Sequence, residues 1–512
     1  MSSGTYNAAT DLIERNLKAG RAGKLAYRDD HAALTYGDLA KRVDAAAHAL
    51  RGLGLQPEQR VLLVMLDTID FPAMFLGAIK AGIVPVPVNT MLATADYDFM
   101  LRDSRAKVLV VSDALYPRLK PILGAQPNLQ HVVVAGEPVD GNATVAALLD
   151  SAASLGPARA ADTTADDIAF WLYSSGSTGQ PKGVVHLQSH LVKTAELFAK
   201  PILQLTENDV LFSASKLFFA YGLGNSLTFP LSVGATTLLT AERTSPAAVF
   251  RMLTKHKPTV FFGAPTLYAA MLASPELPAR GEVSLRLCSS AAEPLPAHIG
   301  IRWTEHFGVH ILDGIGSTEM LHVYLSNRPG DVRYGTTGKP VPGYEIRLVD
   351  DDGSAVPRGE IGELQVSGPT SAAFYWNNRE RSRHTFMGPW TRSGDKYRQD
   401  EDGYYLYCGR TDDMLKVGGI YVSPAEVESA LASHDDVLEA AVVGAKDDAE
   451  LIKPKAYVVL KPGHAPSPAL ADALKDHVKS RLAPYKYPRW IEFIDEMPKT
   501  ATGKIQRFKL RQ

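Results

Sequence analysis

A run rich in glycine and hydroxyl side chains reads Tyr173-Ser174-Ser175-Gly176-Ser177-Thr178-Gly179-Gln180-Pro181-Lys182-Gly183. It follows an apolar run, Ile168-Ala169-Phe170-Trp171-Leu172, whose composition predicts a buried β-strand. Glycines let backbone N–H groups turn toward an anion, hydroxyl side chains add donors, and Lys182 adds positive charge. The stretch therefore predicts a polyphosphate-binding loop directly after a strand, although a flexible Ser/Gly linker is the plain alternative. It is not a Walker A loop, because Gly179 is followed by Gln180 rather than by Lys.

Short apolar runs alternate with amphipathic segments on the N-terminal side of this loop. A helical pattern begins at Thr35-Tyr36-Gly37-Asp38, and a second one runs from Phe71 to Ala81. Apolar runs at 61–66, 108–111 and 131–134 predict strands between and after these helices. This βαβ alternation predicts an α/β fold with largely parallel sheets.

The pattern changes after about residue 340. Two strand-like runs, 344–349 and 361–366, flank the turn signal Asp350-Asp351-Asp352-Gly353 and predict an antiparallel, barrel-like piece. Beyond Arg410 the remaining chain has the size of a small separate domain, about 100 residues. Its expected elements are a helix at 424–431, strands at 438–443 and 455–460, and a helix at 468–481. We therefore expect a large N-terminal domain, 1–411, and a small α+β C-terminal domain, 412–512.

Length and composition limit the classes of function. A chain of 512 residues exceeds one compact core, and its net charge of -2 gives no reason to expect a nucleic-acid partner. Its two cysteines, Cys288 and Cys408, exclude a disulfide scaffold and a thiolate zinc site. The N-terminus lacks the apolar core of a signal peptide, and no apolar run has the length of a membrane span. We expect a cytoplasmic protein with no membrane partner.

The loop at 173–183 closely resembles the phosphate-binding loop of the adenylate-forming superfamily, which includes acyl-CoA synthetases, nonribosomal peptide adenylation domains and firefly-type luciferases. Four further motifs of that superfamily follow in the same order. They are Asp313-Gly314-Ile315-Gly316-Ser317-Thr318-Glu319, Trp390-Thr391-Arg392-Ser393-Gly394-Asp395, the run from Gly409 to Gly419, and Pro498-Lys499-Thr500-Ala501-Thr502-Gly503-Lys504. The resemblance implies a large domain of α/β subdomains with a β-barrel-like piece, and a small mobile C-terminal domain. It also implies that ATP, with Mg²⁺, activates a carboxylic acid as its adenylate, which is then handed to coenzyme A.

The resemblance assigns roles in nucleotide binding by position. Thr178 and Lys182 would hold the β- and γ-phosphates, Thr318 would contact the α-phosphate, and Glu319 would bind Mg²⁺. Asp395 would accept the ribose hydroxyls, with Arg410 close to the same sugar. The full set of expected ATP or AMP contacts is Ser174, Ser175, Gly176, Ser177, Thr178, Gly179, Lys182, Ala292, Glu293, Pro294, Asp313, Asp395 and Arg410. Within it, Ala292-Glu293-Pro294 matches the segment that packs on adenine.

The last motifs carry the two-step chemistry that the resemblance implies. Lys504 would be the cation between the substrate carboxylate and the α-phosphate, acting with Thr318 and Glu319 as a catalytic group. Asp412 matches the hinge at which the small domain rotates after adenylation. Gly418 and Gly419 would then face coenzyme A. Glycine suits these positions, because a side chain at either would narrow the path of the pantetheine arm.

The acyl pocket is expected to take an aromatic acid. Phe219 stands where many relatives have histidine, and this departure resembles the benzoate–CoA ligase branch of the superfamily. By position, the pocket would be lined by Phe219, Ala220, Tyr221, Gly316, His322 and Val323. Such a lining suits one flat ring and offers no evident partner for a para-hydroxyl group, which favours benzoate. A ligase for 4-hydroxybenzoate or another aryl acid, an aryl-adenylating enzyme that loads a carrier protein, and a non-catalytic nucleotide sensor remain alternatives, and homodimerisation stays open.

Overall fold

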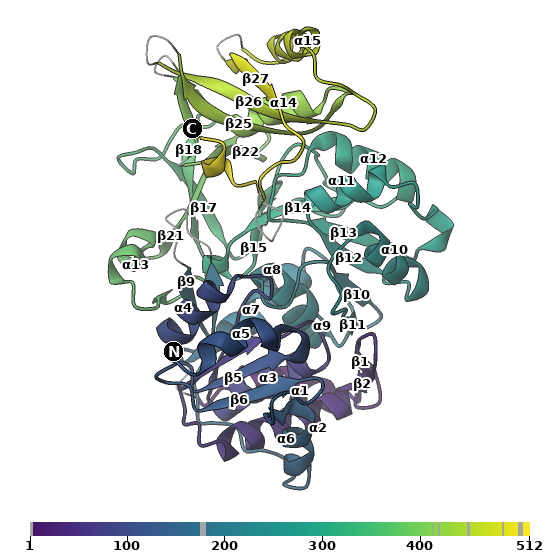
Figure 1. Ribbon diagram of the computed structural model, residues 1–512, viewed down its shortest axis with the longest axis vertical. Coiled ribbons are helices and arrows are strands. Elements are labelled where there is room, and N and C mark those ends of the chain that lie inside the picture. Colours follow the sequence, from purple (N-terminus) through teal and green to yellow (C-terminus); the bar gives the residue numbers. More distant parts are fainter. Residues whose placement is uncertain are drawn as a thin grey trace.

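The computed structural model describes residues 4–174, 181–411, 413–417, 420–447, 451–483, 486–499 and 505–511. Most of the chain forms the lower body in Figure 1, and the segments after about residue 410, drawn in yellow-green, form a smaller part above it. The fold is the mixed α/β fold of adenylate-forming enzymes that the sequence predicts.

A five-stranded parallel sheet organises the N-terminal region of the described chain, in the order β4-β3-β5-β6-β7. Its strands are β3 (Arg60–Val64), β4 (Val84–Pro87), β5 (Val108–Ser112), β6 (His131–Ala135) and β7 (Ala143–Thr144). The surrounding helices are α1 (Ala8–Lys18), α2 (Tyr36–Gly52), α3 (Asp70–Ala81), α4 (Thr94–Ser104), η1 (Asp113–Leu115), α5 (Tyr116–Leu123) and α6 (Val145–Ala153). Val61 and Leu63 pack with α2 and α3, whereas Leu62 and Val64 pack with α4 and α5. Both faces are covered, which explains the uninterrupted apolar runs.

The helix boundaries follow from local sequence signals. The Thr35 side chain accepts a hydrogen bond from the Asp38 N–H, and the Asp38 carboxylate accepts one from the Thr35 N–H, which completes a capping box at the start of α2. Helix α3 ends at Gly82, whose φ of 78° is a left-handed conformation that glycine adopts readily. Both helices were predicted from the sequence within two residues of their observed ends.

A nine-stranded mixed sheet occupies the centre of the described chain, in the order β16-β15-β14-β13-β12-β10-β11-β1-β2. Its strands are β1 (Leu25–Arg28), β2 (Ala33–Thr35), β10 (Val210–Ser213), β11 (Thr236–Leu238), β12 (Val260–Gly263), β13 (Leu287–Ser290), β14 (Ile311–Gly316), β15 (Val323–Ser326) and β16 (Lys339–Pro340). The associated helices are α7 (Gln188–Thr194), η2 (Ala195–Ala199), α8 (Ala220–Leu223), η3 (Gly224–Thr228), α9 (Phe229–Val233), α10 (Pro246–Lys255), α11 (Pro265–Ala273), η4 (Arg280–Glu282), α12 (Ala297–Phe307) and η5 (Thr318–Met320). Strands β10, β12, β13 and β14 run parallel, so their carboxyl ends meet at one edge, where ligands bind in open α/β sheets.

Two smaller sheets complete the large body. Strands β8 (Ile168–Ser174), β9 (Lys182–Leu187) and β19 (Phe374–Tyr375) form an antiparallel sheet in the order β19-β9-β8. The predicted barrel-like piece is an antiparallel sheet of β17 (Glu345–Val349), β18 (Gly362–Ser367), β20 (Phe386–Met387), β21 (Trp390–Gln399) and β22 (Tyr405–Arg410), with helix α13 (Arg379–Thr385) beside it. Strands β17 and β18 pair as the predicted hairpin.

The chain after Arg410 has hydrophobic clusters of its own. Its elements are β23 (Leu415–Val417), β24 (Ile420–Val422), α14 (Pro424–Ala432), β25 (Val437–Lys446), β26 (Ile452–Leu460), α15 (Pro468–Lys479), β27 (Trp490–Phe493) and η7 (Arg507–Lys509). The buried members of both clusters all lie between Leu415 and Leu510. The predicted helices and strands of this region are present, and β25 extends beyond its predicted range at both ends.

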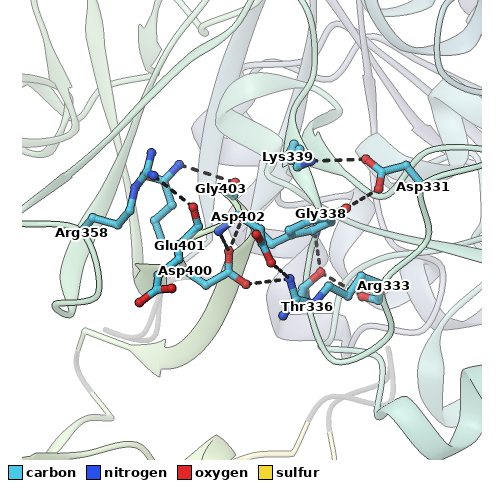
Figure 2. A network of polar contacts seen from close by, with 12 residues as sticks. Asp331, Arg333, Thr336, Gly338, Lys339, Arg358, Asp400, Glu401, Asp402 and Gly403 are labelled. Carbon is cyan, nitrogen blue, oxygen red and sulfur yellow. Dashed lines mark hydrogen bonds and ion pairs between the residues drawn. The ribbon is translucent and has the colours of Figure 1, made fainter.

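A polar joint connects the nine-stranded sheet to strand β22. Figure 2 shows Arg333 between Asp400 and Asp402, with N–O distances of 3.1 and 3.0 Å. Beside these ion pairs, Gly338 and Tyr405 share a backbone hydrogen bond of 2.9 Å. The joint therefore anchors the start of β22, the strand that ends at Arg410, to the segment between β15 and β16.

Candidate active site

The ends of the predicted phosphate loop are held by β-pairing. Ser174 ends β8 and pairs with Lys182, the first residue of β9. Both side chains therefore lie at the same end of this small sheet. The other predicted members of the loop, Ser175, Gly176, Ser177, Thr178 and Gly179, lie outside the described residues.

Lys182 and Glu319 face one another at the base of the loop. Their charged atoms are 3.6 Å apart, and the two side chains are only 10% and 16% exposed. Burial lowers the pKa of Lys182, and the nearby Glu319 carboxylate opposes this shift. The geometry confirms that two residues from separate motifs, more than a hundred positions apart, meet in one site.

Tyr375 completes this group, and sequence analysis missed it. Its hydroxyl group donates a hydrogen bond of 2.8 Å to Oε1 of Glu319. The Lys182 ammonium lies 3.4 Å from the same hydroxyl oxygen and 4.4 Å from the centre of the phenol ring. Lys182 and Tyr375 are 193 residues apart in sequence. No spacing pattern could have joined them, because the contact depends on the pairing of β19 with β9.

The turn that carries Thr318 and Glu319 is held through its backbone carbonyl groups. The Thr318 oxygen lies 2.8 Å from Nε2 of His186, and the Glu319 oxygen accepts a bond of 2.7 Å from the Ala372 N–H. The Met320 oxygen accepts a bond of 2.8 Å from the Thr370 hydroxyl. Three consecutive carbonyl groups are thus fixed by two segments, strand β9 and the loop at 370–372, so the turn keeps its shape before any ligand binds.

His186 reaches this turn from β9 and is supported by His190. Their Nδ1 atoms are 3.1 Å apart. Since the Thr318 oxygen can only accept, Nε2 of the neutral His186 ring donates, which leaves its Nδ1 facing Nδ1 of His190, an atom that the Leu187 N–H also approaches at 3.4 Å. Burial lowers the pKa of His186 to about 4 and that of His190 to about 3, so both rings are neutral near pH 7. The sequence offered no signal for this pair beyond the two histidines themselves.

Asp395 and Arg410 lie opposite one another on the paired strands β21 and β22. Arg410 donates hydrogen bonds from Nη1 to the Asp395 carboxylate, at 2.9 Å, and to the Ser393 carbonyl oxygen, at 3.1 Å. The Asp395 charge raises the pKa of Arg410, so the guanidinium stays protonated. Gly394, directly before Asp395, has a φ of 72°, and a Cβ there would lie 2.8 Å from the Arg410 guanidinium. The structure therefore brings together the two predicted ribose-site residues.

The predicted adenine segment follows strand β13. Ala292 is exposed and has a φ of 80°, an unusual conformation for a residue other than glycine. Glu293 is half-buried and accepts a hydrogen bond of 3.2 Å from Thr266, while Pro294 is exposed. Asp313 is different, because it is buried on the neighbouring strand β14 and desolvation raises the pKa of its carboxyl group. Any contact of this buried carboxyl group with nucleotide stays a prediction.

Two of the predicted acyl-pocket residues, Tyr221 and His322, pack against each other. Their ring centres are 5.4 Å apart, and the Tyr221 hydroxyl group donates to Ser289 at 3.0 Å. His322 is 2% exposed and lies 3.3 Å from the Tyr221 carbonyl oxygen through Nε2. Phe198 and Phe229 enclose the same ring, and burial lowers the pKa of His322 to about 3. His322 is therefore a neutral imidazole in an aromatic cluster, with Nδ1 lacking a hydrogen bond to any described residue.

The remaining pocket residues surround this pair. Gly316 and Val323 are partners on β14 and β15, and a Cβ at Gly316 would lie 2.5 Å from the His322 carbonyl oxygen. This close approach of two strands requires glycine whether or not a ring binds there. Phe219 precedes α8 and packs on Phe218 at 4.4 Å between ring centres, and Ala220 begins that helix. Contact of Phe219, Ala220, Gly316 and Val323 with the acid stays a prediction.

Glu319 also suits the Mg²⁺ ion that accompanies ATP. Mg²⁺ typically takes one or two carboxylates together with substrate phosphates rather than a cage of protein ligands. Within the described ranges there is no cluster of three or more His, Cys, Asp or Glu side chains that could hold a metal ion. A single partly exposed carboxylate beside the phosphate loop fits the first arrangement.

Four further predicted residues, Lys504, Asp412, Gly418 and Gly419, lie outside the described residues. The neighbouring Lys499 pairs with Ile505 in a β-bridge and with Glu439 in an ion pair of 2.5 Å. None of the helices in the described ranges is long and apolar enough to cross a membrane.

The fold and the site together define the class of protein. Residues 13–376 match the model of the AMP-binding enzyme family, and residues 426–504 match that of the AMP-binding enzyme C-terminal domain. The first match covers more than half of the chain, so this protein belongs to the AMP-binding enzyme family.

Relatives with close sequences narrow the comparison. The chain is 62% identical to a benzoate–CoA ligase of Thauera aromatica over 99% of its own length and 96% of the relative. It is 50% identical to a 4-hydroxybenzoate–CoA/benzoate–CoA ligase of Rhodopseudomonas palustris, covering 99% of this chain and 94% of that one. Among solved structures, a benzoate CoA ligase from Burkholderia xenovorans LB400 superimposes with a TM-score of 0.93 at 57% identity, covering 99% and 100% of the two chains.

Proposed function

We propose that this protein is an AMP-forming acid–thiol ligase that converts an aromatic carboxylic acid, with benzoate favoured, into its coenzyme A thioester. In the first half-reaction a carboxylate oxygen attacks the α-phosphorus of ATP and pyrophosphate leaves. In the second, the thiol sulfur of coenzyme A attacks the acyl carbon and AMP leaves. The observation that carries the proposal is the 62% identity to a benzoate–CoA ligase along nearly the whole chain.

The described residues suit the first half-reaction. Lys182 brings a buried cation to the phosphates, and Arg410 holds Asp395 beside the predicted ribose position. Thr318 would contact the α-phosphate from a turn whose carbonyl groups are already fixed. Glu319 would hold Mg²⁺, which neutralises charge on the phosphates of bound ATP. Ala292, Glu293 and Pro294 would form the adenine platform.

The role of the small domain rests on the family resemblance. We place the domain boundary at Asp412, with an N-terminal domain of 1–411 and a C-terminal domain of 412–512. Lys504 would neutralise charge between carboxylate and α-phosphate, and rotation at Asp412 would then turn Gly418 and Gly419 toward coenzyme A. The separate hydrophobic clusters after Leu415 support this division.

The choice of acid rests on the pocket lining. Tyr221 and Val323 would pack on the ring edges, and the neutral His322 ring would close the far side. Discrimination by shape alone typically amounts to about 1–3 kcal/mol per group, so small ring substituents should be tolerated. A 4-hydroxybenzoate–CoA ligase is therefore the second candidate, favoured by the bifunctional relative at 50% identity.

Two measurements test the proposal. Pyrophosphate exchange should be fast with benzoate and slow with octanoate, and direct formation of benzoyl-CoA should need no carrier protein. Faster exchange with octanoate would overturn the choice of acid, and exchange without benzoyl-CoA formation would point to a carrier-loading enzyme. Competition between benzoate and 4-hydroxybenzoate ranks the two aryl acids.

The same proposal concerns location and assembly. An enzyme that consumes ATP and coenzyme A is expected in the cytoplasm, where fractionation should recover it. Homodimerisation stays a prediction, which light scattering of the purified protein decides.

A further inference from the structure

Tyr375 occupies a backbone position that is fixed by strand pairing. It lies opposite Val184 in the register between β19 and β9, two residues along the strand from Lys182. Its backbone N–H donates to the Ser382 hydroxyl at 2.9 Å, and the residue is only 3% exposed. The phenol ring therefore has little freedom to move when ligands enter or leave.

The Tyr375 hydroxyl group lies between two charged partners. It has one proton, which it donates to Oε1 of Glu319 at 2.8 Å, and its oxygen faces the Lys182 ammonium at 3.4 Å. Lys182 also approaches Oε1, at 3.6 Å. Both contacts to Glu319 use Oε1, and its Oε2 makes no hydrogen bond or ion pair with the described residues.

We propose that Tyr375 is a positioning residue that orients Glu319 so that Oε2 faces the Mg²⁺ ion of incoming Mg·ATP, and that it keeps Lys182 from closing onto the carboxylate. This inference rests on the proposed function, because it assumes that Glu319 and Lys182 bind Mg·ATP. A buried lysine and glutamate without an intervening group would form a direct, hydrogen-bonded ion pair. Neither charged group would then be available to Mg·ATP. The phenol hydroxyl group donates to Glu319 and accepts from Lys182, and the charged atoms of the two residues stay 3.6 Å apart.

Two substitutions separate the hydroxyl group from the ring. Tyr375→Phe removes the hydrogen bonds and keeps the ring beneath the Lys182 ammonium, whereas Tyr375→Leu removes both. Tyr97→Phe is the matched control, because it deletes a phenol hydroxyl group that donates to the Asn89 carbonyl in the N-terminal part of the chain. Thermal unfolding of the two Phe variants should stay close to that of the wild type, and that of Tyr375→Leu reports the additional cost of removing a buried ring.

Calorimetric titration of ATP without acid, in excess MgCl₂ and in EDTA, gives a readout that needs no turnover. We expect Tyr375→Phe to weaken binding in MgCl₂ about tenfold and binding in EDTA less than about twofold, since a lost charged hydrogen bond acts only through the metal ligand. Tyr375→Leu should weaken both, and Tyr97→Phe neither. Equal losses for Tyr375→Phe in both buffers, or no loss in either, would overturn the inference.

A double-mutant cycle identifies the route of the effect. In a Glu319→Gln background, Tyr375→Phe should cause no further loss of binding in MgCl₂, because the hydroxyl group acts through Glu319. Additive losses would contradict that route. Failure of the wild type itself to bind ATP or to form benzoyl-CoA would instead reject the proposed function, so the two failures can be told apart.

Discussion

Nε2 of His186 lies 2.8 Å from the carbonyl oxygen of Thr318, so strand β9 supports the turn that presents Glu319. Strand β9 thus carries both Lys182 and His186, and His186 holds the turn that contains Thr318 and Glu319. The Leu321 N–H also donates to this oxygen, at 3.2 Å, so loss of the His186 bond would remove the long-range partner and leave only a local bond within the turn.

His186→Phe should therefore lower kcat/KM for ATP by roughly 10- to 100-fold, because the turn that carries Thr318 and Glu319 loses one of its three anchors. His186→Gln should stay within several-fold of the wild type, since its amide nitrogen can occupy the position of Nε2. Steady-state kinetics with saturating benzoate provides the comparison. Equal losses in the two variants would argue for packing rather than for the hydrogen bond.

The pair formed by Asp395 and Arg410 should matter for binding more than for folding. Arg410 is 46% exposed, so its ion pair is worth little to stability, whereas Asp395 is largely buried at the predicted ribose site. We expect Asp395→Asn to raise the KM for ATP roughly 10-fold or more while leaving the unfolding temperature nearly unchanged. A large fall in unfolding temperature with an unaltered KM would assign Asp395 a structural role.

Gly316→Ala should destabilise the protein. The new Cβ would lie 2.5 Å from the His322 carbonyl oxygen, a backbone atom that cannot rotate away. Overpacking of this kind typically costs about 1–3 kcal/mol, and adenylation should fall with it because β14 leads into the Thr318 turn. Gly281→Ala is the control, since nothing lies within 4 Å of its added Cβ. Differential scanning calorimetry of both variants tests the contrast.

Acidification should destabilise the fold through its buried histidines. His186, His190 and His322 titrate at pKa values of about 4, 3 and 3 in the folded chain, against 6.5 for an ordinary histidine. Their stabilising contribution is complete above pH 6.5 and is lost as the pH falls toward 4, by up to about 3 kcal/mol each. Thermal unfolding followed from pH 8 to pH 4.5 should show this decline, with a shallower slope for His322→Asn.

Asp67 provides a control, because its effect on stability should change with pH in the opposite direction. Burial raises the pKa of its carboxyl group from 3.8 to about 6, so its contribution is complete below pH 3.8 and is lost as the pH rises through 6. Asn can still accept the Leu217 N–H bond that Asp67 accepts now. Asp67→Asn should thus stabilise the protein most at pH 7.5 and progressively less on acidification. The same gain at all pH values would contradict the assigned pKa shift.

Local patterns predicted much of the fold. The capping box at Thr35, the glycine that ends α3 and the turn between β17 and β18 are encoded within a few residues of each element. Strand pairings over long distances have no such signal. For that reason β19, only two residues long, and the Tyr375 contact that it creates were not foreseen.

The site was predicted unevenly for the same reason. The ordered motifs predicted four site residues that the structure brings together in two pairs. Lys182 contacts Glu319, and Asp395 contacts Arg410. Position in the sequence assigns Gly316 to the pocket lining, whereas the close approach of two backbones already requires glycine there. Motifs identify the residues that are expected to contact substrate. They identify less readily the residues that support those groups, such as His186.

Two non-glycine residues with positive φ flank the site: Ala292 at 80° and Leu321 at 65°. Left-handed backbone costs such residues about 1–2 kcal/mol, which the surrounding structure must offset. Directed evolution for heat tolerance could therefore be expected to select glycine at position 292. The backbone of the predicted adenine platform would then become more flexible. Loss of the Ala292 methyl group would thus raise thermal stability and lower the precision of nucleotide recognition.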